Sequence, residues 1–129
     1  MTDNEPTLLT PAEMASRTGT TIDTLRYYER EGLITGIVRG ASGHRRYSDV
    51  DVGWVEVLRC LRLTGMPIQQ MKAFAALGAA GTHTEAERHA QLLAHRATVV
   101  ESIRELEAAL VVLDKKTAIY EDALRAKGS

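Results

Sequence analysis

The first part of the chain has the apolar spacing and capping signals of short helices separated by glycines. The run from Thr10 to Glu13 (TPAE) offers an N-cap, a proline at the first helical position and an acid at the third, so we expect a helix to about Arg17. Gly19 breaks the pattern. A second helix is expected from Thr21 to Gly32, which suits a left-handed cap. Two short helices joined by a glycine-containing turn predict a helix-turn-helix.

Two β-prone pairs follow the second helix, Leu33-Ile34 and Ile37-Val38, and Gly40 and Gly43 bracket a turn after them. This pattern predicts a two-stranded wing. No acid lies between Leu33 and Ser48, while the wing carries three arginines: Arg39, Arg45 and Arg46. The wing is therefore predicted to attract anions.

A third helix is expected to begin after Ser48, which can cap it. Its apolar stripe at helical spacing is predicted to face the core and consists of Val50, Trp54, Val57, Leu58 and Leu61. Gly65 ends this helix, Pro67 opens the next, and the side chains expected to close the core are Met71, Phe74 and Leu77. We expect a helix-turn-helix domain over residues 7–78 and a glycine- and alanine-rich hinge over residues 79–83.

The last segment, residues 84–126, has no proline or glycine and predicts one long helix, with Thr84 and Glu87 as a second capping box. Spacings of three and four alternate along this segment when Arg96 and Thr117 fill two polar gaps, and the apolar residues of the seam are Leu92, Val99, Ile103, Leu106, Leu110, Leu113, Tyr120 and Leu124. A helix of about 40 residues would be about 60 Å long. One helix cannot bury such a seam, so we expect an antiparallel coiled coil in a homodimer. The alternative is a helix that folds back on its own domain.

Composition limits the class of protein further. The chain of 129 residues is 44% hydrophobic and 26% charged, which is typical of a soluble protein. It has no apolar run of about 18 residues and no secretory signal, so we expect no membrane contact. Its single cysteine fits a reducing compartment, so we expect a cytoplasmic protein. The formal net charge is −1, and residues 20–72 hold eight Arg or Lys against six Asp or Glu. Binding to a polyanion would therefore need a local basic patch.

Three stretches and their order resemble the MerR family of bacterial transcription regulators: TLRYYEREGLI, GHRRYSDVDVGWVEVLRCLRLTGMPIQQMKAF and the long helix that follows. The resemblance covers nearly the whole chain. It implies a mainly α fold, with a winged helix-turn-helix domain followed by a dimerisation helix in an antiparallel coiled coil. It also implies that a homodimer binds double-stranded promoter DNA and bends and untwists it, so that RNA polymerase engages promoter hexamers set too far apart.

Candidate DNA contacts follow from the two predicted basic elements. Arg26 and Tyr27 lie on the exposed side of the second helix and are expected to bind phosphate, with Tyr28 in the core. Arg26 paired with Glu29 is the alternative. The full set of candidates is Thr10, Thr21, Asp23, Thr24, Arg26, Tyr27, Arg39, His44, Arg45 and Tyr47.

Within this set the residues have different expected roles. Base contacts are expected around Thr21, Asp23 and Thr24. Arg45 and Tyr47 should share the face of the return strand that the resemblance places on DNA. His44 is expected to shape the wing, and Arg46 to pair with an acid of the third helix.

The residues that could sense an inducing signal are Cys60 and the histidines. His83, His89 and His95 are six residues apart, a spacing that scatters them around a helix, so we expect no metal site and no cofactor. The chain stops at Ser129, and a separate effector domain is not expected. Around Cys60, LRCLRLTGMP resembles the MerR subgroup that responds to formaldehyde and other reactive carbonyls through one thiol.

Two interpretations of Cys60 remain open. Arg59 and Arg62 lie close in sequence, and positive charge favours the nucleophilic thiolate. A thiol packed against Val57 and Leu61 would instead be an inert small hydrophobe.

Other functional classes have weaker support. An enzyme would need a nucleophile with a base, and no histidine lies near the single cysteine in sequence, so no catalytic activity is expected. A regulator that responds to metals or other small molecules is one alternative. A coiled-coil adaptor without DNA binding is another, but it leaves RYYE and the wing unexplained.

Overall fold

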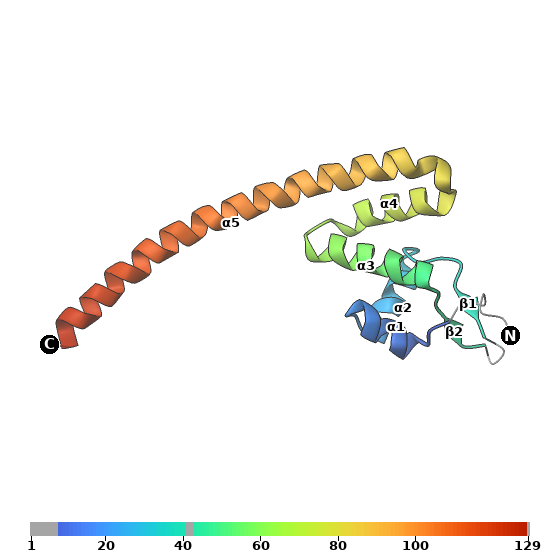
Figure 1. The fold of residues 1–129 in the computed structure, drawn as a ribbon, viewed down its shortest axis with the longest axis horizontal. Helices are drawn as coiled ribbons and strands as arrows, with labels where there is room; N and C mark the ends of the chain where they lie inside the picture. Colours follow the sequence, from blue (N-terminus) through green and yellow to red (C-terminus); the bar gives the residue numbers. More distant parts are fainter. Residues whose placement is uncertain (1–7, 41–42, 129) are drawn as a thin grey trace. The chain divides into compact units, whose positions relative to one another are not determined.

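The computed structural model describes residues 8–40 and 43–128. The chain forms two compact units, one up to His89 and one from Ala90 onward, and each is described by itself. The predicted domain start at residue 7 and the wing tip at residues 41–42 lie outside the described residues. In the first unit α3 lies between the pair α1 and α2 and the helix α4, with the two short strands to one side (Figure 1).

The predicted helix-turn-helix is confirmed as α1 (Pro11–Thr18) and α2 (Ile22–Arg30). The Thr10 hydroxyl accepts the Glu13 amide at 3.2 Å, and the Glu13 carboxylate accepts the Thr10 amide at 3.0 Å, so the capping box is complete. These hydrogen bonds to Thr10 hold the pKa of the Glu13 carboxyl below its usual value. Gly19 takes the left-handed conformation at φ 67°, which turns the chain from α1 toward α2.

The wing is also confirmed, although its strands are short. β1 (Val38–Arg39) pairs antiparallel with β2 (Arg45–Arg46), and Arg39 lies opposite Arg45. The first β-prone pair, Leu33-Ile34, is not a strand. Its side chains are only 2% and 4% exposed and belong to the hydrophobic core beneath the helix-turn-helix.

Helices α3 (Asp49–Leu63) and α4 (Ile68–Ala80) complete the first unit, and Ser48 caps α3 as predicted. The prediction that Val50 faces the core is wrong, because its side chain is 82% exposed. The buried side of α3 is instead centred on Val55 and Leu58, so Trp54 lies at its edge and Val50 lies beyond it. The buried residues of α3 are Val52, Val55, Leu58 and Leu61.

Trp54 ties three parts of this unit together. Its ring stacks on Phe74 of α4, with 5.4 Å between centroids and 7° between planes. Its indole N–H donates to the Leu33 carbonyl oxygen at 2.7 Å. A half-buried aromatic ring with its polar atom satisfied fixes the loop after α2 against α3 and α4.

The connection to the long helix differs from the predicted capping box. A 3₁₀ turn, η1 (Thr82–Thr84), leads into α5 (Glu85–Gly128). The hydroxyl of Thr84 is buried and points to the carbonyl oxygens of Leu77 at 2.6 Å and Gly81 at 2.8 Å. It therefore closes the end of α4 and does not pair with Glu87. Of the predicted hinge, residues 79 and 80 complete α4.

The second unit is the continuation of α5 from Ala90. Its predicted seam residues are all at least partly exposed: Val99 is half-buried, and the other seven range from 36% at Leu92 to 68% at Leu124. Such a row of exposed apolar side chains on one helix is typical of a surface that meets another chain. None of the described helices has the length and hydropathy needed to cross a membrane.

Candidate nucleic-acid interface

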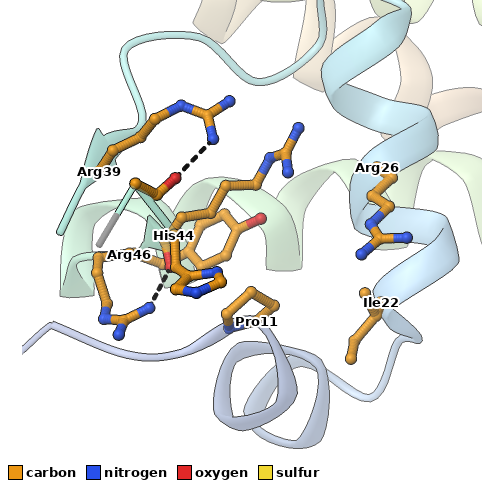
Figure 2. Close-up of a pocket in the computed structure, with 9 residues that line it drawn as sticks. Pro11, Ile22, Arg26, Arg39, His44 and Arg46 are labelled. Carbon is orange, nitrogen blue, oxygen red and sulfur yellow. Dashed lines mark hydrogen bonds between the residues drawn. The ribbon is translucent and has the colours of Figure 1, made fainter. Parts of the chain in front are cut away.

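A hollow of about 320 Å³ opens between the helix-turn-helix and the wing. In Figure 2 Arg26 and Ile22 border it from α2, Pro11 from the start of α1, and Arg39, His44 and Arg46 from the wing. Its remaining lining residues are Gly43, Arg45 and Tyr47. Four arginines and a histidine thus surround one opening without an acid in its lining, which suits a polyanion. This hollow is the local basic patch that a chain without a positive net charge needs in order to bind a polyanion.

Helix α2 presents the expected residues to solvent. Arg26 is exposed, and the adjacent tyrosines separate as predicted: Tyr27 is 36% exposed and Tyr28 is 4% exposed. The Thr21 hydroxyl accepts the Thr24 amide at 3.1 Å, so it caps the helix that it was expected to present to DNA. An exposed helix N-terminus with its cap adds a favourable field for a phosphate.

Two wing arginines stabilise the conformation of the wing itself. Arg39 donates from Nη1 to the Gly43 carbonyl oxygen at 3.0 Å, and Arg46 donates to the Arg45 carbonyl oxygen at 2.9 Å, as the dashed lines in Figure 2 show. The expected pairing of Arg46 with an acid of the third helix is therefore replaced by a bond within the strand. His44 is exposed, and its carbonyl accepts the Gly40 amide at 2.8 Å, which fits its expected part in shaping the wing.

Arg45 makes a contact that no local sequence pattern predicts. Its Nε donates to Glu29 Oε2 of α2 at 2.5 Å, and the two side chains are 33% and 15% exposed respectively. Glu29 was considered as a partner for Arg26 and instead pairs with the wing. The sequence feature that could have singled out Glu29 is its position in RYYE, one helical turn after Arg26.

Tyr47 corrects the prediction that it shares an exposed face with Arg45. It is 1% exposed and belongs to the core, so its ring cannot project onto DNA as a strand residue would. The regular pairing of β2 ends at Arg46, and Tyr47 forms an isolated bridge with Leu9 through hydrogen bonds of 2.7 and 2.9 Å. Burial raises the pKa of its phenol, and the Glu29 carboxylate adds to this shift.

The remaining candidates have mixed positions. Thr10 is partly buried and engaged in its capping box, while Asp23 is exposed at the start of α2. Cys60 is an exposed free thiol on α3, so it does not pack in the core as one interpretation expected. Its neighbour Arg59 donates to the Gly19 carbonyl oxygen at 3.1 Å. Within the described residues no group of His, Cys, Asp and Glu gathers as metal ligands.

Comparisons with known proteins agree with this geometry. Residues 9–76 match the model of the MerR HTH family regulatory proteins. The uncharacterized HTH-type transcriptional regulator of Haemophilus influenzae is 37% identical over 120 residues, which are 93% of this chain and 88% of that protein. The regulator AdhR of Bacillus subtilis is 37% identical over 90 residues, which are 70% of this chain and 64% of AdhR.

A solved structure extends the similarity to the fold. HiNmlR, described as a MerR family regulator lacking the sensor domain and bound to promoter DNA, is 36% identical, with a TM-score of 0.84 over 95% of this chain and 97% of that one. The family match covers the helix-turn-helix, the wing, α3 and most of α4. This chain therefore belongs to the MerR family of DNA-binding transcriptional regulators.

Proposed function

We propose that two copies of this chain pair through the seam of α5 and bind one pseudo-palindromic promoter element, which they bend and untwist to control access by RNA polymerase. The observation that carries this proposal is the basic hollow between α2 and the wing, bordered by Arg26, Arg39, Arg45 and Arg46. A phosphate backbone is the polyanion that such a hollow fits. The promoter DNA bound by HiNmlR supports this assignment.

Pairing provides the symmetry that the DNA site requires. A two-fold dimer places two equivalent basic hollows on two half-sites, so the DNA sequence should be close to palindromic. The exposed seam on α5 supports pairing, because an unpaired α5 leaves the seam leucines in water. Bending a duplex by tens of degrees costs about 1–6 kcal/mol, and additional phosphate contacts by the two wings offset that cost.

The test uses the promoter upstream of the gene for this chain, in its natural form and with the spacer between its hexamers shortened. Transcription by purified RNA polymerase should rise with the protein on the natural spacer, and this dependence should disappear as the spacer is shortened. Labelled ends should approach each other in energy-transfer measurements when the protein binds. Equal stimulation at all spacer lengths would contradict distortion as the mechanism. Absence of any shifted band in an electrophoretic assay would leave the coiled-coil adaptor as the better account.

We also propose that Cys60 is the thiol through which reactive aldehydes act on this regulator. Its exposure on α3 makes the sulfur accessible, and its setting in LRCLRLTGMP resembles the carbonyl-responsive subgroup. The thiolate sulfur would add to the carbonyl carbon, the C=O π electrons would move to oxygen, and water would supply the proton. With formaldehyde the product is an S-hydroxymethyl group.

The Cys60→Ser variant tests this assignment. Formaldehyde or methylglyoxal should change transcription from the target promoter with the natural chain and leave it unchanged with Cys60→Ser. Mass spectrometry of the treated chain should locate the adduct at Cys60. Identical transcriptional responses of the two proteins would contradict the sensor role of Cys60. The proposal that the chain binds DNA would be unaffected by that result.

A further inference from the structure

The ion pair between Glu29 and Arg45 joins the two halves of the basic hollow. Glu29 lies on α2 and Arg45 on β2, 16 residues apart in sequence. The other described wing arginines, Arg39 and Arg46, donate hydrogen bonds to carbonyl oxygens of the wing itself. Arg45 is thus the wing arginine whose side chain pairs with α2.

The contact engages one specific part of the guanidinium. Glu29 Oε2 accepts from Nε at 2.5 Å, which leaves the four N–H groups of the two terminal nitrogens for other acceptors. The carboxylate is the more buried partner, at 15% exposed against 33% for Arg45. Arg45 also lines the hollow, whereas Glu29 does not. The acid therefore holds Arg45 through Nε from outside the lining of the hollow, and its bond does not use the two terminal nitrogens.

We propose that Glu29 is a positioning residue that holds the Arg45 guanidinium in the orientation in which its terminal nitrogens bind a DNA phosphate. This inference rests on the proposed function, because it assigns a role within the same DNA site. Fixing an arginine in advance lowers the conformational entropy lost when phosphate binds. The bond also fixes the wing against α2, so that the spacing of their phosphate contacts is set before DNA arrives.

An opposite role for Glu29 is a competitor that occupies Arg45 in place of phosphate. The two roles predict opposite signs for Glu29→Gln, which removes one negative charge from each DNA site. Charge alone, or release of a competitor, would tighten binding and steepen its salt dependence. Positioning predicts that binding weakens by about fivefold for each hollow, the scale of one net hydrogen bond, and so by about 25-fold for a dimer, and that the salt dependence becomes flatter.

The measurement is fluorescence anisotropy with a labelled promoter duplex and a random duplex at several salt concentrations. Glu31→Gln is the matched control, because Glu31 also lies at the end of α2 and pairs with a base, Lys72, at 2.8 Å, away from the hollow. It removes the same charge, and its affinity should equal or exceed that of the natural chain. Tighter binding by Glu29→Gln would overturn the positioning role and establish competition.

A double substitution separates positioning from a general structural effect. In an Arg45→Ala background Glu29 has no guanidinium to position, so adding Glu29→Gln should now strengthen binding through charge alone. The sign of the Glu29→Gln effect therefore reverses between the two backgrounds. Weakening of equal size in both backgrounds would overturn the proposal.

The exchanged pair, Glu29→Arg with Arg45→Glu, covers the case in which the single variants fold poorly. It rebuilds an ion pair with the opposite direction, so thermal stability should return while DNA binding stays weak. Recovery of DNA binding together with stability would overturn the positioning role. If the natural chain binds neither duplex at low salt, the proposed function fails as well. If it binds and only the signs above differ, only the role of Glu29 fails.

Discussion

At the scale of single residues, side chains that look alike in the sequence have different roles. Tyr27 and Tyr47 both follow an arginine in a basic segment, and both were expected at the DNA. Tyr27 is 36% exposed and Tyr47 is 1% exposed. Tyr47→Ala should therefore lower the free energy of unfolding by about 3–5 kcal/mol, the range for deleting a large buried aromatic ring. Chemical denaturation measures this loss.

Tyr27→Ala is the matched comparison for Tyr47→Ala. It should leave the free energy of unfolding within about 1 kcal/mol of the natural chain, since the ring is partly in solvent. It should still weaken DNA binding if the phenol reaches a phosphate. A large stability loss from Tyr27→Ala, or none from Tyr47→Ala, would contradict the burial described for these two rings.

Arg26 carries a prediction about ionic strength. Each phosphate contact contributes about 0.9 to the slope of log K against log salt concentration, and a dimer has two copies of Arg26, so Arg26→Ala should flatten the slope by about two. Affinity should fall on every DNA sequence alike, because phosphates carry no sequence information. Arg104→Ala, on exposed α5, removes the same charge and should leave the slope unchanged. An unaltered slope for Arg26→Ala in anisotropy titrations would rule out a phosphate contact.

Which residues were predictable depends on the range of their interactions. The caps Thr10, Thr21 and Ser48 bond to amides three residues away, so the sequence alone indicates them. Glu29 pairs with Arg45, 16 residues away on a wing whose position depends on the packing of the whole core. No local sequence pattern predicts that partner. Tyr47 was misplaced because strand alternation was extended one residue beyond the last regular pair.

At the scale of elements, helix limits followed from glycine and capping residues, while the rotation of α3 did not. The predicted stripe included Val50, whereas packing against α1 and α4 buries the side centred on Val55 and Leu58. An apolar stripe wider than the contact leaves its true centre undefined until the neighbouring helices are placed. Thr84 was assigned to the start of α5 because Thr84 and Glu87 have the spacing of a capping box, although its hydroxyl closes α4.

Two helical glycines give opposite predictions on substitution by alanine. A Cβ at Gly53 of α3 meets nothing within 4 Å, so Gly53→Ala should stabilise the chain by up to about 1 kcal/mol through helix propensity. A Cβ at Gly78 of α4 lies 3.0 Å from the ring of Trp54. That ring is held by Phe74 and by the Leu33 carbonyl, so it has little freedom to move. Gly78→Ala should lower stability by about 1 kcal/mol or more.

Thermal unfolding of both variants beside the natural chain measures this pair. The midpoint should rise for Gly53→Ala and fall for Gly78→Ala. A rise for both would mean that the Trp54 ring shifts freely, and the packing that joins α3 to α4 would then be looser than its contacts indicate.

At the scale of the whole molecule, the proposed pairing through the α5 seam predicts that two chains form the functional unit. Leu106 lies in the seam and Val112 lies outside it, and each side chain is 66% exposed, so they form a matched pair on one helix. In a lone helix, replacing either by Glu places a charge in solvent at similar cost. If the seam is buried between two copies, Leu106→Glu instead places two carboxylates in an apolar interface and should abolish the dimer.

Sedimentation equilibrium should therefore find a dimer for the natural chain and for Val112→Glu, and a monomer for Leu106→Glu at micromolar concentration. Promoter affinity should fall with the monomer, because one basic hollow contacts only half of the site. Its salt dependence should fall to about half, since the number of phosphates contacted is halved. A dimer that survives Leu106→Glu, or one lost with Val112→Glu, would place the contact on another face of α5. The two-fold arrangement of the basic hollows would then have to be derived from that face.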